Sequence, residues 1–232
     1  RIHKAYPNAV KSKVLTKNET VFAAGCGFYK IVMLFFIGAF LGDITETIFC
    51  RITAGVWMSR SSVVWGPFSI VWGLAIGAVT ALLYKYKDKS DSFLFTAGTL
   101  LGGAYEYLCS VFTEMMFGKV FWDYSKIPFN LGGRINLLYC FFWGIAAVAW
   151  IKGIYPVMSA WIEKIPINFG KAATWLLLIF FCVDMAVSGL ALVRSSEREK
   201  GIPADSAWQQ VMDEHYGDEV LKKIYPNALK VE

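Results

Sequence analysis

The chain has 232 residues, of which 56% are hydrophobic and only 18% are charged, and its mean hydropathy is +0.46. Soluble domains carry about 25% charged residues, so this composition excludes an ordinary soluble domain and predicts an integral membrane protein. The net charge of +5 is modest. We interpret it as loops and tails that face anionic lipid, and we expect no nucleic-acid partner.

Five apolar runs are long enough to cross a bilayer, which takes about 20 helical residues. The expected spans are 29–54, 63–84, 93–117, 135–154 and 172–193. A basic segment, 1–28, precedes them. A polar tail, 194–232, follows, and Trp208, Val211 and Met212 in it predict a short amphipathic helix behind Asp205 and Ser206. The expected fold class is all-α, a polytopic membrane protein with about five transmembrane helices.

Glycine and proline mark irregular places in these spans. Gly66 and Pro67 should kink the second span or let it begin inside the membrane. Pro156 follows the expected end of the fourth span, and residues 157–170 predict an interfacial amphipathic piece.

Two stretches, 38–46 and 98–106, share the pattern Gly-x-x-Leu-Gly-x-x-x-Glu. Residues four apart lie on one face of a helix, so each stretch places two glycines and a carboxylate in one line. We call these lines the glycine stripes; their helix-packing residues are Gly38, Gly42, Gly98 and Gly102. Small residues at this spacing let another helix approach closely in membranes, and we expect the two stripes to pack on each other.

The stripes end in Glu46 and Glu106, the principal candidate site residues. A carboxylate inside an apolar span is costly and is a functional-site hypothesis by default. Two such groups near a shared axis favour a cation or proton site, with Asp43 as a further ligand on the same face. The alternative is that both glutamates are structural and accept hydrogen bonds from helix neighbours. Which metal, if any, would bind is left open.

Trp72-Gly73 and Trp143-Gly144 take matching places in the second and fourth spans. Together with the stripes they predict an internal repeat of two parallel two-helix hairpins. A second repeat joins the ends: 3–11 and 222–230 agree at Lys, Tyr, Pro, Asn, Ala and Lys. We therefore expect residues 1–11 to resemble the end of a preceding unit, with both copies forming the same short turn at the membrane surface.

The loop 118–134 and the head of the fourth span contribute Asp123, Arg134 and Asn136 as gate or headgroup contacts. Arg134 could pair with Glu106 or with an anionic substrate group; the alternative is a structural staple from Asp123 to Arg134. In the fifth span, Asp184 is expected to be an internal partner of another polar group.

The glycine stripes, the run Trp65-Gly-Pro-Phe-Ser-Ile-Val-Trp-Gly73, the loop 121–134 and the Tyr-Pro-Asn ending carry a resemblance. Together they resemble the bacterial ABC transporter permease family of the CmpB type. The resemblance covers roughly 29–232 and implies a multi-pass protein of the cell (inner) membrane. It implies no catalytic residues.

The favoured function is a transport or permease component with a central acidic site that binds a cation or a cationic small molecule. The chain has no Gly-x-x-x-x-Gly-Lys-[Ser/Thr] motif, so ATP hydrolysis would need a separate ATPase subunit. Partners expected are membrane lipid and such an ATPase or further copies of the chain; no cofactor is expected. Alternatives are a membrane enzyme with a glutamate as general base, or a non-catalytic assembly subunit. Lys and Arg counts favour a cytoplasmic amino end.

Overall fold

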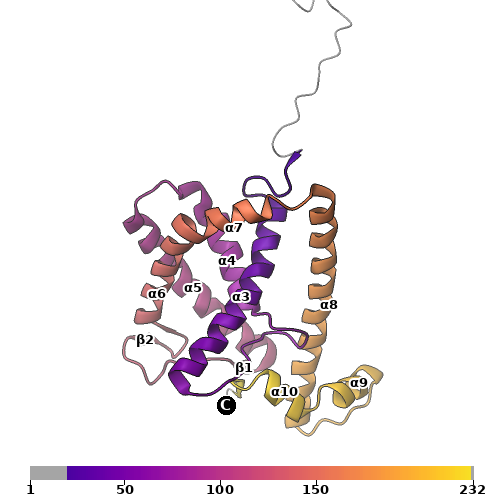
Figure 1. Cartoon of the computed structure of the whole chain (residues 1–232). Coiled ribbons are helices and arrows are strands. Elements are labelled where there is room, and N and C mark those ends of the chain that lie inside the picture. The colour runs from indigo at the N-terminus through magenta and orange to yellow at the C-terminus, as the bar shows by residue number, and fades with distance from the viewer. Residues whose placement is uncertain (1–19, 231–232) are drawn as a thin grey trace, which may run out of the picture.

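The computed structural model describes residues 20–230 and is built from helices joined by turns and by two longer loops, 55–69 and 118–136 (Figure 1). In chain order the helices of the described part are α3 (Phe28–Ala54), α4 (Ile70–Leu83), α5 (Asp91–Phe117), α6 (Leu137–Ala149), α7 (Tyr155–Ile162), α8 (Ile167–Glu199), α9 (Ala207–His215) and α10 (Asp218–Ile224). Two short turns of helix, η1 (Tyr84–Tyr86) and the π-helical η2 (Trp150–Ile154), extend α4 and α6. The all-α fold class is confirmed.

Four two-residue strands pair at the connections. β2 (Asn130–Leu131) and β3 (Ile135–Asn136) form a small antiparallel hairpin inside the loop between α5 and α6. β1 (Lys119–Val120) pairs antiparallel with β4 (Leu229–Lys230), with Lys119 opposite Lys230. The second pair joins the end of α5 to the end of the described chain.

Both long helices of the first half end at a glycine. Gly55 closes α3 with φ +73° and Gly118 closes α5 with φ +63°, and each backbone N–H returns to a carbonyl four residues earlier. Only a residue without a Cβ adopts this left-handed conformation at little cost. The two helices therefore stop at defined points.

The helices pack as two hairpins, α3 against α4 and α5 against α6. Each glycine stripe lies on the following helix: a Cβ added at Gly42 would overlap the Cβ of Trp72, and one at Gly102 would overlap the Cβ of Trp143. The expectation that the stripes pack on each other is therefore wrong. The bulky neighbour of each stripe is the tryptophan side chain of its own hairpin, which occupies the space the glycines leave.

The second expected span begins later than the sequence indicated. Residues 63–69 are loop, and α4 starts at Ile70 behind Ser69, whose hydroxyl accepts a hydrogen bond from the Trp72 N–H. Gly66 has φ +88° and Pro67 cannot donate a backbone hydrogen bond. The Gly-Pro pair thus lies before the helix instead of kinking it.

The fourth expected span continues past Pro156. The π-turn η2 leads directly into α7, and Pro156 stands in the first turn of that helix, where its missing N–H costs little. Figure 1 shows α7 crossing towards the amino-terminal end of α3. There Lys30 is fully buried and contacts both Ser159 and Glu163. Residues 157–170 are therefore not one interfacial piece, because α7 ends at Ile162 and α8 begins at Ile167.

Within the described residues, three helical segments are long and apolar enough to cross a membrane: Phe28–Ala54, Leu137–Ile162 and Ile167–Glu199. Ile70–Tyr86 is a shorter apolar helix. Large hydrophobic side chains remain exposed along these helices, such as Phe49, Leu176 and Ile179. An exposed apolar surface of this kind suits contact with lipid.

The end of α8 carries a carboxyl-terminal unit made of α9, α10 and β4 (Figure 1). Its apolar contact with α8 is a buried cluster of Ala191, Leu192, Met212, Leu221 and Tyr225. Its polar contact centres on Arg194, which is only 2% exposed and donates to both carboxylate oxygens of Asp213. Arg198 also pairs with Asp213 and with Asp218.

The packing of this carboxyl-terminal unit on α8 should weaken at acid pH. The hydrogen bonds from Arg194 lower the pKa of Asp213 from its usual 3.8 to about 2. A lowered pKa means that the ion pair stabilises docking above the usual value, and that this contribution is lost as pH falls through about 4 towards 2. Limited proteolysis of 200–217 between pH 5 and pH 2 measures the loss. We expect Asp213→Asn to be cleaved readily even at pH 5, whereas the exposed Asp205→Asn should follow the wild-type curve.

Candidate functional site

Glu46 lies between two donors. Its Oε1 accepts a hydrogen bond from the indole Nε1 of Trp72 at 2.9 Å, and its Oε2 pairs with Nε of Arg60 at 3.0 Å. Trp72 is positioned by its packing on Gly42, one helical turn before Glu46. Arg60 comes from the loop 55–69. The close approach of α3 and α4 thus sets the position of this carboxylate.

Glu106 repeats this arrangement in the second hairpin. Its Oε2 accepts from the indole Nε1 of Trp143 at 3.1 Å, and Trp143 packs on Gly102. Its Oε1 accepts from the Tyr124 hydroxyl at 2.6 Å. Glu106 is 7% exposed, so it is a buried carboxylate with neutral donors where Glu46 has an arginine.

The two tryptophans join the hairpins. The ring centroids of Trp72 and Trp143 are 5.5 Å apart, a distance typical of favourable aromatic pairs. Tyr105, next to Glu106, donates its hydroxyl to the backbone oxygen of Val71, next to Trp72. Each glutamate therefore lies beside one ring of a tryptophan pair that bridges α4 and α6.

The nearby carboxylates affect the pKa of the Tyr124 hydroxyl. Burial raises the pKa of the Tyr124 hydroxyl, and the nearby carboxylates of Glu106 and, more weakly, Glu46 raise it further. The hydroxyl therefore stays protonated and remains a hydrogen-bond donor to Glu106 at neutral pH.

The predicted gate residues hold the loop between α5 and α6. Arg134 pairs with Glu114 and donates to Ser110, so the predicted pairing with Glu106 or with Asp123 is wrong. The β2–β3 hairpin directs Arg134 towards the end of α5, where Glu114 lies about two helical turns beyond Glu106.

The other two members of that set are capping groups. Asp123 accepts from the backbone and side chain of Ser125, and these hydrogen bonds lower the pKa of its carboxyl. Asn136 caps α6 by accepting from the Leu138 N–H and donates to the Pro128 oxygen. Both arrangements are local and shape the loop.

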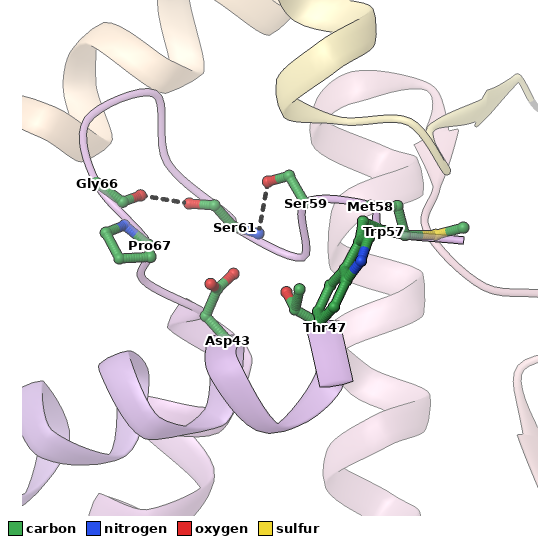
Figure 2. A pocket seen from close by; sticks show the side chains of 8 residues that line it. All are labelled: Asp43, Thr47, Trp57, Met58, Ser59, Ser61, Gly66 and Pro67. Atoms are coloured by element: carbon green, nitrogen blue, oxygen red, sulfur yellow. Dashed lines mark hydrogen bonds between the residues drawn. The ribbon is translucent and has the colours of Figure 1, made fainter. Parts of the chain in front are cut away.

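Asp43 lines a cavity of about 420 Å³, widely open to the outside, between α3 and the loop 55–69 (Figure 2). The lining consists of Asp43, Thr47, Trp57, Met58, Ser59, Ser61, Gly66 and Pro67. In Figure 2 the Asp43 carboxylate points up between the two arms of the loop. The side chain is 6% exposed, and within residues 20–230 its Oδ1 has no hydrogen-bond partner.

The far side of the same loop is fixed by α8. Asp184 is fully buried and accepts a hydrogen bond from the Trp65 N–H at 3.1 Å, while Ser188 accepts from the Val64 N–H. This agrees with the expectation that Asp184 is an internal partner. The carboxyl-terminal unit adds Tyr225, whose hydroxyl donates to the Ser62 oxygen. These hydrogen bonds from α8 and from the carboxyl-terminal unit therefore fix the loop 55–69 on its side away from the cavity.

The donors to the glutamates, Arg60, Trp72, Tyr124 and Trp143, were not among the sequence-predicted site residues. The matching Trp-Gly pairs were a signal for two of them: in each hairpin the glycine after the tryptophan also meets the first helix, Gly73 at Phe35 and Gly144 at Phe95. A Trp-Gly pair at a close crossing places an indole N–H next to whatever polar group the facing stripe carries.

These features define a class: a helical membrane protein with carboxylates at the crossing points of two hairpins, of which Glu106 is buried and Glu46 is partly exposed. The family comparison agrees with this class. Residues 33–189, which include both hairpins and the cavity, match the family described as "Putative ABC-transporter type IV", and the chain belongs to that family. No curated protein and no solved structure matches the chain.

Proposed function

We propose that the chain is a membrane-embedded transport component of an ABC-type system, with an acidic centre formed by Asp43, Glu46 and Glu106 that receives a cation or a cationic small molecule. The observation that carries the proposal is the paired Glu–Trp arrangement at the contact between the hairpins. Of the two carboxylates, Glu106 is buried, and buried carboxylates in membrane spans are costly and mark ion or proton sites.

The two hairpins are, in this proposal, two copies of one unit. Support comes from three matching features: stripe glycines that meet a tryptophan, an indole N–H that donates to a glutamate, and a glycine after the tryptophan that meets the first helix. The copies differ at their second donor, Arg60 in one and Tyr124 in the other. In many transporters built from repeats, the substrate and ion sites lie near the middle of the membrane, at the interface between the repeats.

The proposal places α3, α4, α5, α6 and α8 across the cell membrane, with the amino end cytoplasmic and a separate ATPase subunit as partner. Figure 1 supports an odd number of crossings, since the start of α3 and the carboxyl-terminal unit lie at opposite ends of the bundle. The energy source would be the partner, because the chain has no phosphate-binding glycine-rich loop of its own.

Charge movement in reconstituted membranes tests the proposal. Proteoliposomes on a solid-supported electrode should give a transient current when Na⁺, K⁺ or methylammonium is added, and the transient should disappear in the Glu46→Gln, Glu106→Gln double variant. Glutamine keeps an oxygen for each indole N–H while it removes the charge. The exposed Glu219→Gln is the matched control and should behave as wild type. Unchanged transients in a folded double variant, or none in wild type, would reject the acidic centre.

A further inference from the structure

Resting on the proposed function, we propose that the cavity above Asp43 is the binding site for a small organic cation that carries a primary ammonium group. The site combines the Asp43 carboxyl, whose Oδ1 is buried and has no hydrogen-bond partner within residues 20–230, with a cavity that Asp43 lines (Figure 2). A buried carboxylate oxygen without a donor costs free energy, and a ligand N–H⁺ group would remove that cost.

The neighbouring arginines are already engaged. Arg60 directs its Nε to Glu46, and Arg51 donates to the Gly55 oxygen while its guanidinium lies 5.8 Å from the Trp57 ring. Within the described residues, neither forms an ion pair with Asp43. The backbone N–H of Arg60 donates to the Asp43 carboxyl and the charge of Arg60 acts on it, and a ligand ammonium would add a direct ion pair.

The size and lining of the cavity favour an organic cation over a bare metal ion. A volume of about 420 Å³ falls in the range of small-molecule pockets, roughly 300–1,000 Å³. Across residues 20–230, no three His, Cys, Asp or Glu side chains are arranged to hold a metal. Trp57, Met58 and Pro67 give the cavity an apolar side, and Thr47 and Ser59 give it hydroxyl groups.

The same lining favours a primary ammonium over a quaternary one. Quaternary ammonium groups have no N–H and are recognised by cages of several aromatic rings. The ring lining this cavity is that of Trp57. A primary ammonium has three N–H donors, which suit the Asp43 carboxylate and the hydroxyl oxygens of Thr47 and Ser59, and a short alkyl body would lie against Met58 and Pro67.

Isothermal titration of the full chain in detergent with n-butylammonium tests the assignment. Wild type should bind it, and bind tetramethylammonium, n-butanol and Na⁺ at least about tenfold more weakly, because each lacks an N–H⁺ group. Asp43→Asn should weaken butylammonium binding roughly tenfold to a hundredfold. Asp88→Asn, an exposed carboxylate on the connection between α4 and α5, is the matched control and should not change it.

A second variant covers the case in which Asp43→Asn does not fold. Thr47→Val, one turn further along α3, should weaken butylammonium binding and leave the weak binding of n-butanol unchanged. Equal binding of butylammonium and tetramethylammonium, or no effect of Asp43→Asn in a folded variant, would overturn the site. Butylammonium binding without charge movement in proteoliposomes would support the binding site and reject the transport function. Na⁺ currents without butylammonium binding would support the transport function and reject the binding site.

Discussion

Gly42→Ala is expected to destabilise the protein by about 1–3 kcal/mol, the range for overpacking a tight contact. The added methyl group would overlap the Cβ of Trp72, so α3 and α4 would have to move apart. The indole N–H to Glu46 contact of 2.9 Å would lengthen with them. Gly102→Ala should act alike through Trp143. Equilibrium unfolding in mixed detergent micelles measures the change.

Gly189→Ala provides the matched control for these variants. Gly189 lies within α8, and a Cβ added there would meet nothing within 4 Å. Because alanine is the better helix former by about 1 kcal/mol, this variant should be neutral or slightly more stable. If Gly42→Ala and Gly189→Ala unfolded alike, the close crossing of α3 and α4 would be wrong.

Arg194→Met should release the carboxyl-terminal unit from α8. Arg194 donates to Asp213, to Glu197 and to the Ile202 oxygen, and hydrogen bonds to charged groups contribute roughly 1.5–3 kcal/mol. Methionine keeps the apolar stem and removes every donor, so α9 should lose its anchor. Amide hydrogen exchange of 207–225 should rise strongly, while exchange in α5 and α6 should stay as in wild type.

Lys200→Met is the control for this variant, since it removes an exposed cation two residues after Arg198, at the end of α8. It should leave exchange in α9 and α10 unchanged. Protection of α9 that survives in Arg194→Met would mean that the apolar contacts of Met212 and Leu221 are sufficient for docking.

The sequence predicted the helical class and the close crossings, because apolar length and glycine spacing are local signals. It did not predict which helix fills each crossing. A stripe such as Gly38 and Gly42 indicates only that another helix packs closely on it. The contacting atom, the Cβ of Trp72, belongs to a different helix. Which helix packs there depends on how the loop between the two helices folds. The expected packing of stripe on stripe failed for this reason.

In the candidate site, too, some residues could be predicted from the sequence and others could not. Glu46, Glu106 and Asp43 stand out in the sequence because charges are rare in apolar runs. Their partners do not stand out: Arg60 and Tyr124 lie in loops, where polar residues are ordinary. Sequence position alone leaves Arg134 free to pair with Glu106, with Asp123 or with an anionic substrate group, whereas the β2–β3 hairpin turns it to Glu114.

The continuation of the chain through Pro156 has a different cause. Proline ends most helices because it lacks an N–H and crowds the preceding turn. Here the wider π-turn of Trp150–Ile154 precedes it and changes the hydrogen-bond register, so Pro156 falls in a first turn. A π-turn has no simple sequence pattern, and the expected end of the fourth span was therefore too early.

The length of α8 sets how the protein sits in a bilayer. Its 33 residues measure about 50 Å at 1.5 Å per residue, whereas the hydrocarbon layer is about 30 Å thick. Roughly 20 Å of helix must therefore project into the headgroups or beyond. Arg194 and Arg198, near its carboxyl end, are clamped to Asp213, so the helix cannot sink deeper without carrying α9 along. We therefore expect the ion-paired end of α8 to stay at the membrane surface, together with α9, in membranes of different thickness.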